Sequence, residues 1–464
     1  MSDLFKLGLI EVQENLRQGN FTSYELTTCL LSRIDELDPV LHAFATRTPE
    51  LALSQAREAD KARARGENLG WMQGIPLGLK DLCATEGAPT HAGSLACANW
   101  RPQIESTVAA RLRKSGAVLL GKLTTTEGAS GVHHPEITAP VNPWNYQHWV
   151  GASSSGSASA TSAGLCMASL GSDTGGSIRF PSQCCGLVGL KPTWGLVSRH
   201  GVFPLAPSLD HIGPMARRVE DVAAVLSVIA GRDELDPTTV HRSRLDYNSF
   251  LRDDLSQLRL GFDTRFCSEG VNSFVVGSIE SAVEILREHR VKVLPVSLPT
   301  TRDVHDAWLV QCGIEAAASH HETFPTKKSD YGPALAALLE WGNKRSHVEI
   351  VNSLLTRKAL IQEWDRIFGN VDAVISPTTF DPVPTLEKGR SQMRGKDMRR
   401  LMHFTLQANL VGLPTVSIPG AIDSSGVPTG FQIIGRPFGE ADLLKLGYAI
   451  QNGRDWTSRE IPPL

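Results

Sequence analysis

Serine and glycine are concentrated between Val150 and Gly201, and this stretch carries the residue types that acyl transfer needs. Composition alone would make a Ser/Gly-rich stretch a linker or a cluster of turns. Apolar side chains recur through this one, so we expect it to be ordered and packed. In the segment from Gly171 to Ser177, GSDTGGS, the glycines allow successive backbone N–H groups to turn toward one point beside a hydroxyl. Such an arrangement can stabilise an oxyanion.

Three separate segments of the chain resemble one enzyme family. They are GIPLGLKDL (74–82), GASSSGSAS (151–159) and GSDTGGSIRFPSQCCGLVGLKPT (171–193), in the order found in the amidase-signature hydrolases. The spacing is similar too, because Ser153 lies 24 residues before Ser177. The first segment supplies the lysine that this family requires, at Lys80.

The resemblance implies a Ser-Ser-Lys triad in which Ser177 is the nucleophile, Ser153 relays the proton and Lys80 is the base. A serine hydroxyl is a poor nucleophile and needs a base within hydrogen-bond reach. A lysine can be that base only when neutral, so burial must lower its pKa from about 10.4 toward the working pH. The apolar segment around Lys80 predicts a strand that delivers the side chain into the interior. The nearest histidines, His200 and His211, fall in predicted turns.

Backbone N–H groups of Thr174, Gly175, Gly176 and Ser177 are the oxyanion hole that the resemblance implies. Each donor of this kind contributes about 3 kcal/mol to the stabilisation of a transition state.

Three further residues of the matched segments are expected to support the site. Asp173 and Arg179 match family positions that hold the glycine turn in shape, and Ser154 neighbours the relaying serine. The family usually has GGSSGG where this chain has GASSSG, so Ala152 and Ser155 replace glycines. Because both central serines remain, we expect the triad to be intact.

Two other patterns resemble binding sites only in part. GAVLLGK (116–122) satisfies the start of a phosphate-binding loop, but Leu123 stands where that motif needs Ser or Thr, and AVLL predicts a buried strand. His133, His134 and Glu136 could suggest a metal, but no further ligand follows at a familiar spacing, so we expect a loop near the mouth of the site. We expect neither a metal nor a cofactor.

The reaction expected from these residues is the hydrolysis of an amide, or of a related carbamate or urea, through an acyl-Ser177 intermediate. The alternative is the A subunit of a glutamyl-tRNA amidotransferase, which has the same triad. In that protein, an Asp lies seven residues before the Asn of an NLxGLP motif and helps to hold glutamine. Here the Asn is Asn409, and the position seven residues earlier is Met402. A non-catalytic scaffold is disfavoured because all three triad positions are kept.

The substrate predicted from this loss of a carboxylate is a neutral aryl or alkyl amide, an anilide or a small carbamate (urethane). Trp144, Trp149, Trp308 and Trp341 lie in the segments 124–149 and 300–370, which are expected to shape the pocket. Apolar surface would then select the substrate, at about 0.8 kcal/mol per buried methylene.

Composition and charge agree with a cytoplasmic enzyme acting on a small molecule. The 464 residues are 41% hydrophobic and 20% charged, and 46 basic against 49 acidic residues give a net charge of -3, which predicts neither nucleic-acid nor anionic-membrane binding. The N-terminus lacks the continuous apolar region of a signal peptide, and no run approaches the roughly 18 apolar residues of a membrane span. The eight cysteines have no CxxC pair and are expected to be buried thiols. The sequence does not determine the oligomeric state, and a homodimer is one of the alternatives.

Alternating strand and helix patterns indicate an α/β fold, and the resemblance implies a large mixed, twisted sheet with helices on both faces. We expect one domain, 1–464, with a divergent substrate-shaping region at about 240–370. A capping box at Thr22 predicts a helix that stops before Pro39, and a turn is expected at Gly213-Pro214. Further helices are predicted at 49–65, 106–115, 219–230, 272–288, 303–322 and 346–368, and strands at 74–80, 116–122, 258–263, 291–296 and 371–379.

Overall fold

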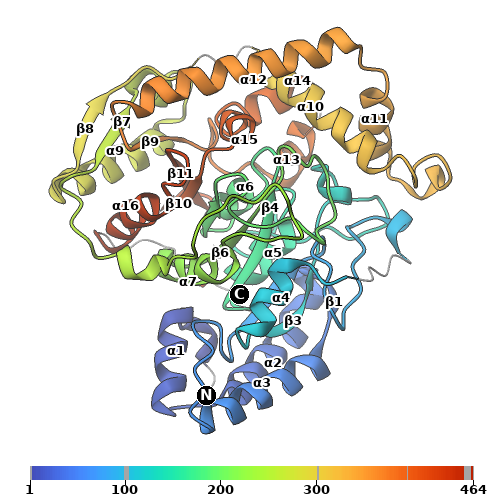
Figure 1. Ribbon diagram of the computed structural model, residues 1–464, viewed down its shortest axis with the longest axis vertical. Helices are drawn as coiled ribbons and strands as arrows, with labels where there is room; N and C mark the ends of the chain where they lie inside the picture. The colour runs from blue at the N-terminus through green and yellow to red at the C-terminus, as the bar shows by residue number, and fades with distance from the viewer. Residues whose placement is uncertain (1–2, 99–103, 300–302, 394, 454–460, 463–464) are drawn as a thin grey trace.

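A single eleven-stranded sheet forms the centre of the computed structural model, which describes residues 3–98, 104–299, 303–393, 395–453 and 461–462 (Figure 1). The strand order is β1-β3-β2-β4-β6-β5-β10-β11-β9-β7-β8. The strands are β1 (Phe44–Arg47), β2 (Pro76–Lys80), β3 (Val118–Leu123), β4 (Ala168–Asp173), β5 (Val188–Lys191), β6 (His211–Ala216), β7 (Arg259–Phe262), β8 (Lys292–Pro295), β9 (Ala373–Pro377), β10 (Thr415–Ile422) and β11 (Pro428–Gly435).

The sheet is mixed, as predicted. Strand β2 runs parallel to its neighbours β3 and β4, and β7 runs parallel to β8 and β9. The remaining neighbours pair antiparallel. The predicted α/β class with a large mixed sheet is therefore confirmed.

Helices cover both faces of this sheet. This is seen from neighbouring residues of one strand, which point to opposite faces and lie in different hydrophobic cores. Ile433 lies in a core with helices α7, α9 and α16, whereas its neighbour Ile434 lies in a second core with α10, α12 and α15. The α-helices of the described residues are α1 (Leu9–Gln18), α2 (Ser23–Leu41), α3 (Pro49–Ala64), α4 (Thr107–Lys114), α5 (Ser155–Ser162), α6 (Arg179–Cys184), α7 (Val219–Ile229), α8 (Thr264–Ser268), α9 (Ser273–Glu288), α10 (Val304–Ser319), α11 (Pro333–Gly342), α12 (His347–Phe368), α13 (Leu386–Gln392), α14 (Gly395–Leu401), α15 (Leu406–Val411) and α16 (Glu440–Gly453).

The predicted N-terminal helix begins as expected but ends later. Thr22 caps α2, and its side chain and that of Glu25 form the capping box. The helix continues through Pro39 to Leu41, so the expected stop before the proline was wrong. Pro39 lies in the last turn, where its ring removes a single intrahelical hydrogen bond, and the Asp38 carboxylate accepts the N–H groups of the residues that follow the helix.

Gly213-Pro214 was predicted to be a turn, but it lies inside strand β6. Gly213 pairs with Gly171 of β4, and a methyl group on Gly213 would overlap the carbonyl oxygen of Leu190 in β5. The glycine therefore serves a close approach of two strands, which a local pattern cannot distinguish from a turn. His211, which was also expected in a turn, is the first residue of this buried strand.

The divergent region contributes β7, β8 and α8 to α12, and α11 was not predicted. Residues 300–302, at the start of a segment expected to shape the pocket, lie outside the described residues. His320, at the C-terminal end of α10, is 1% exposed, and its Nδ1 is 3.0 Å from the Tyr331 hydroxyl. All eight cysteines are free, and seven of them are buried.

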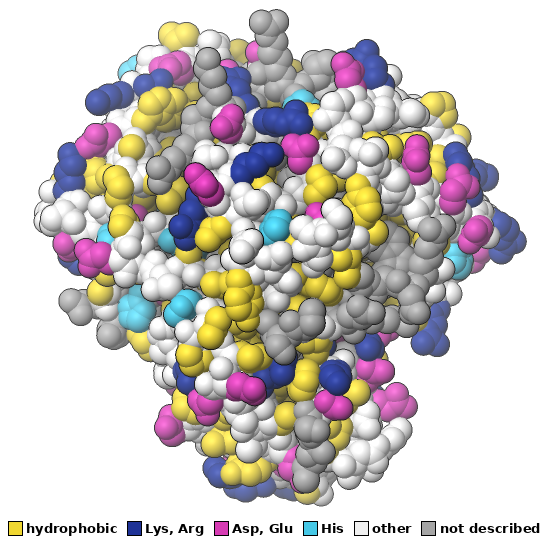
Figure 2. Space-filling model, turned by 180° about the vertical axis from the view of Figure 1, so that it is seen from behind, with side chains coloured by type: hydrophobic (Ala, Val, Ile, Leu, Met, Phe, Trp, Pro, Cys, Tyr) yellow, Lys and Arg dark blue, Asp and Glu magenta, His cyan; other side chains and the backbone are white. Residues whose placement is uncertain are grey.

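On the face shown in Figure 2, acidic and basic side chains are interspersed. None of the described helices is both long enough and apolar enough to cross a membrane.

Candidate active site

Lys80 lies at the end of β2, between β3 and β4, and its side chain is completely enclosed. Three hydroxyl groups surround its amine. Lys80 Nζ is 2.7 Å from Ser153 Oγ, 2.9 Å from Ser154 Oγ and 2.8 Å from Ser172 Oγ. Strand β2, the start of helix α5 and strand β4 thus bring together residues that are distant in the sequence.

The pKa of Lys80 falls to about 7, because burial removes the water that would solvate its ammonium form. Cys83, Asp173 and Asp210 oppose this shift through their charge, but more weakly. Lys80 is therefore a lysine with a substantial neutral fraction near neutral pH, which is the property required of a lysine base.

The two neighbouring serines differ in their hydrogen bonds. Ser154 Oγ accepts from Lys80 Nζ and from the N–H of Ser172 at 3.2 Å, and it donates to the Ser172 carbonyl at 3.2 Å. A hydroxyl has one proton and two lone pairs, so Ser154 has used all three. Within the described part of the chain, Ser153 Oγ bonds only to Lys80, so its proton and one lone pair stay free.

Ser177 lies in the turn between β4 and α6, and it is only partly buried. Its carbonyl accepts a bond of 3.2 Å from the N–H of Ser154, which ties the turn to the start of α5. Among the described residues, no group forms a hydrogen bond with the Ser177 hydroxyl. The structure thus brings Lys80, Ser153 and Ser154 into direct contact and ties the backbone of Ser177 to Ser154, while the Ser177 hydroxyl stays unengaged among the described residues.

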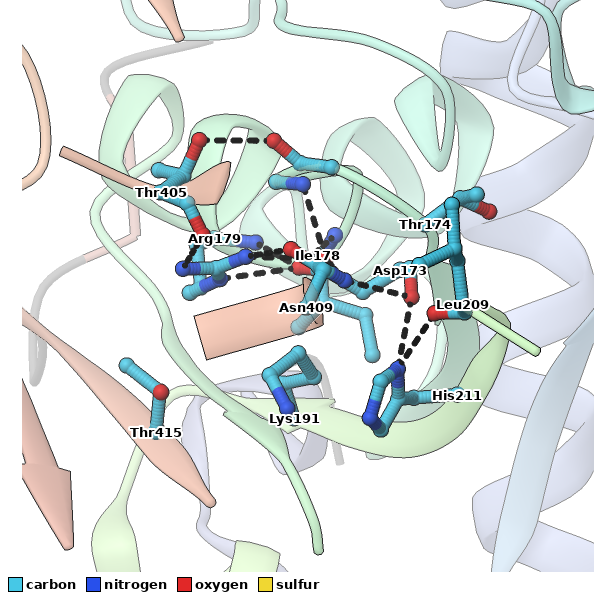
Figure 3. Close-up of polar contacts among 12 residues, drawn as sticks. Asp173, Thr174, Ile178, Arg179, Lys191, Leu209, His211, Thr405, Asn409 and Thr415 are labelled. Carbon is cyan, nitrogen blue, oxygen red and sulfur yellow. Dashed lines mark hydrogen bonds and ion pairs between the residues drawn. The ribbon is translucent and has the colours of Figure 1, made fainter. Parts of the chain in front are cut away.

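Asp173 and Arg179 form the internal support of this turn (Figure 3). Both are fully buried, and Arg179 Nη2 lies 3.0 Å from Asp173 Oδ1. The carboxylate also accepts the N–H groups of Gly176 and Ile178 and the side-chain amide of Asn409. Burial alone would raise the pKa of Asp173, but Arg179 and these donors hold it well below its usual range. The carboxylate thus closes the turn from inside.

The N–H groups expected to form an oxyanion hole are not equivalent. Gly176 N–H donates to Asp173 Oδ1 at 2.7 Å, so it is already engaged and does not fit the expected role. In the described residues, the N–H groups of Thr174, Gly175 and Ser177 have no acceptor. Only these three stay available for an oxyanion.

Side chains from other elements fasten the carbonyl groups of the same turn. Trp308 Nε1 donates to the Thr174 carbonyl at 2.8 Å, and Thr405 Oγ1 donates to the Gly175 carbonyl at 2.6 Å. Thr174 Oγ1 donates to Asp210 at 2.6 Å. Burial raises the pKa of Asp210 to about 6, although the Thr174 hydroxyl and the backbone N–H groups of Leu205 and Ala206 oppose the rise.

Several of these groups were not predicted from the sequence. Ser172 was inside the matched segment and could have been noticed as a hydroxyl on the strand before the turn. Thr405 had no local signal, because it reaches the turn from just before α15. Trp308 was named among the tryptophans of the pocket-shaping segments, but its contact with the turn from α10 was not predicted. Of the four tryptophans, Trp308 contacts the turn, whereas Trp144 bonds to Ser162 and to the Cys185 carbonyl inside the fold.

His133 lies near Lys80, in the loop that the sequence placed near the site. Its Nε2 is 2.9 Å from Ser155 Oγ. Loss of hydration lowers the pKa of His133 to about 4, with smaller contributions from the charges of Arg390 and Lys80, so its ring is neutral at physiological pH. His134 Nδ1 accepts the N–H of Glu136 at 3.2 Å.

A cavity of about 270 Å³ reaches Ser172, one of the three serines whose hydroxyl groups surround Lys80. Its polar lining includes Ser172, Arg199, Asp210 and Asp236, and its apolar lining includes Leu82, Val202, Phe203 and Leu205. Its size is close to the lower limit for small-molecule sites.

Comparison with known proteins shows the family of this chain. The model of the family described as Amidase matches residues 25–444. The protein AmiD of Mycobacterium tuberculosis, which is named as an amidase, is 40% identical over 466 residues, covering 98% of this chain and 96% of its own. The A subunit of the glutamyl-tRNA(Gln) amidotransferase of Chloroflexus aggregans is 37% identical over 486 residues, covering 99% of both chains. The solved peptide amidase of Stenotrophomonas maltophilia has a TM-score of 0.83 and 30% identity, covering 98% of both chains. The chain therefore belongs to the amidase-signature family.

Proposed function

We propose that this enzyme is a serine-dependent amidohydrolase that cleaves the C–N bond of neutral aryl or alkyl amides, anilides or small carbamates through an acyl-Ser177 intermediate. The observation that supports this most directly is the enclosed Lys80, whose pKa of about 7 accompanies a 2.7 Å contact with Ser153. A lysine in this state can remove a proton from a hydroxyl, whereas an ordinary surface lysine cannot.

In the acylation step, Ser177 Oγ attacks the substrate carbonyl and loses its proton to Ser153, which passes its own proton to neutral Lys80. The negative charge that develops on the carbonyl oxygen is held by the N–H groups of Thr174, Gly175 and Ser177. Collapse of the tetrahedral intermediate breaks the C–N bond, and the proton returns from Lys80 through Ser153 to the leaving amine. Water then attacks the acyl-Ser177 ester by the same route, which releases the carboxylic acid and restores both serines.

Ser153 suits the relay better than Ser154 for a reason of hydrogen-bond capacity. The relay must donate a proton to neutral Lys80 and accept one from Ser177 in the same event. The proton and both lone pairs of Ser154 are already used by Lys80 and Ser172, whereas Ser153 keeps its proton and a lone pair available. We therefore give Ser154 the role of holding Lys80 in position.

The preference for neutral substrates rests on the surroundings of Gly175. The methyl group of Met402 and the indole of Trp308 pack so closely against Gly175 that any side chain at this position would clash with them. Met402 and Trp308 are 5% and 7% exposed. An apolar wall beside the proposed oxyanion hole favours neutral groups, because it offers no counter-charge to an ionic one.

The second candidate function is the glutaminase component of a glutamyl-tRNA amidotransferase. The 37% identity to such a protein along the whole chain favours it. Met402 stands against it, because the carboxylate that would help to hold glutamine is replaced by an apolar side chain.

Steady-state kinetics of the isolated protein on acetanilide-type anilides, alkyl amides, small carbamates and glutamine test the proposal. We expect anilides or alkyl amides to exceed glutamine by at least roughly tenfold in kcat/KM, which corresponds to about 1.4 kcal/mol. A fluorophosphonate should label Ser177, and the folded Ser177→Ala variant should be neither labelled nor active. Glutamine turnover equal to that of the anilide, or turnover only with tRNA and partner proteins present, would assign the chain to the amidotransferases instead.

A further inference from the structure

Trp308 differs from the other contacts of the glycine turn, because it comes from the divergent region and bonds to the backbone of the proposed oxyanion hole. It lies on α10 and is 7% exposed. Its indole N–H donates to the Thr174 carbonyl at 2.8 Å, and its ring packs against Gly175.

The geometry of one peptide group links this contact to the site. The Thr174 carbonyl and the Gly175 N–H belong to the same peptide, and in the described residues the only cis peptide bond is Ala152-Ser153. In a trans peptide the C=O and N–H groups point in opposite directions. Because Trp308 holds the carbonyl on the α10 side, the Gly175 N–H points away from α10, where no described residue accepts it.

In the next peptide of the turn, both the carbonyl and the N–H group form hydrogen bonds within the protein. The Gly175 carbonyl accepts from Thr405, and the Gly176 N–H on its other side donates to Asp173. The Thr174-Gly175 peptide has a donor on its carbonyl only. A hydrogen bond to a carbonyl also polarises the peptide, which strengthens its N–H as a donor.

We propose that Trp308 is a positioning residue for the reaction. Its indole N–H orients and polarises the Thr174-Gly175 peptide so that the Gly175 N–H is a preorganised oxyanion donor. This inference rests on the proposed function, because the oxyanion arises in that reaction. Preorganised donors matter at the transition state and little in the ground state, so the effect belongs in kcat and not in KM.

The test replaces the indole N–H and keeps the ring. Trp308→Phe removes the donor, and 3-benzothienylalanine at position 308 replaces N–H by sulfur in a ring of the same shape, so a folding defect of the first variant would not hide the result. Trp364→Phe is the matched control, because Trp364 is 1% exposed and its Nε1 donates to Gln407 at 3.0 Å and not to a group of the turn.

We expect both position-308 variants to lower kcat on an anilide by roughly tenfold, less than the loss of a direct oxyanion donor, with KM unchanged within about twofold. Binding of phenylboronic acid should weaken by a similar factor, since its boron takes the Ser177 oxygen as a fourth ligand while the serine proton passes to Lys80. The Trp364 variant should keep kcat within about twofold at a comparable loss of melting temperature.

Two results would overturn the inference alone: unchanged kcat and boronate binding in both position-308 variants, or an equal loss in Trp364→Phe. A wild-type enzyme that hydrolyses no amide would overturn the inference and the proposed function together.

Discussion

Lys80 Nζ and Ser153 Oγ lie 2.7 Å apart in an enclosed part of the interior, where their exposed fractions are 1% and 0%. The burial of this contact decides which of the two groups can hold the proton. In water, a lysine beside a serine would stay protonated and could only donate to it. Enclosure brings the pKa of Lys80 to about 7, so the same pair can transfer a proton from oxygen to nitrogen.

Activity should rise with pH through the titration of Lys80. The base works in its neutral form, and its pKa is lowered to about 7, so kcat/KM should increase as pH rises through about 7 and then level. Lys80→Arg should be nearly inactive, because a guanidinium does not deprotonate in this range. A pH-rate profile of both proteins checks this. A flat profile for the wild type, or an active arginine variant, would contradict the role of Lys80.

Alanine substitutions should separate the two adjacent serines. Ser153→Ala removes the relay and should lower kcat by roughly 10²- to 10⁴-fold. Ser154→Ala removes one acceptor of Lys80 and should cost roughly tenfold, because the proton path remains. Ser159→Ala serves as a control, since its hydroxyl bonds to the Val141 carbonyl elsewhere on α5. Single-turnover rates of the three variants give the comparison, and a larger loss from Ser154 than from Ser153 would reverse the assignment.

Met402 should control the preference between neutral and glutamine substrates. Met402→Asp places a carboxylate at a position that is 5% exposed, so we expect anilide kcat/KM to fall and the glutamine-to-anilide ratio to rise by at least roughly tenfold. Met402→Leu keeps the apolar wall and should keep the ratio. If the aspartate variant left the ratio unchanged, selection would have to come from another part of the pocket.

The Asp173–Arg179 pair should be essential for the stability of the turn. Asp173→Asn leaves Arg179 charged, buried and without its ion-pair partner, and it should lower the free energy of unfolding by about 3 to 5 kcal/mol. Asp372→Asn should cost less, because its partner Arg259 is 38% exposed. Urea unfolding measures both variants.

The pH dependence of the stability lost in Asp173→Asn provides a second check on the role of the Asp173 carboxylate. The pKa of Asp173 is lowered in the folded protein, so its contribution is fully present above the unfolded value of about 3.9 and is lost as pH falls toward the folded value. The difference in the free energy of unfolding between the wild type and Asp173→Asn should therefore decrease only in strong acid. A difference that disappeared near neutral pH would mean that another group is responsible.

The sequence by itself determined the residue types of the site and the class of fold. Ser153, Ser177 and Lys80 stand in segments with a distinctive order and spacing, and the strand and helix periodicities predicted most of the elements around them. The exceptions were local signals that tertiary contacts overrode. Gly213-Pro214 has the composition of a turn, but it lies inside a strand because the Leu190 backbone approaches it closely.

The tertiary structure decided which groups can act and in what state. Only the fold encloses Lys80 and so sets its pKa, and only the hydrogen-bond partners show that Ser154 is saturated while Ser153 is not. Gly176 matched the expected oxyanion hole in sequence, yet its N–H is donated to Asp173. Trp308 reaches the turn from a helix more than a hundred residues further along the chain. Burial and hydrogen-bond saturation depend on which distant segments meet, and a linear pattern of residues does not contain that information.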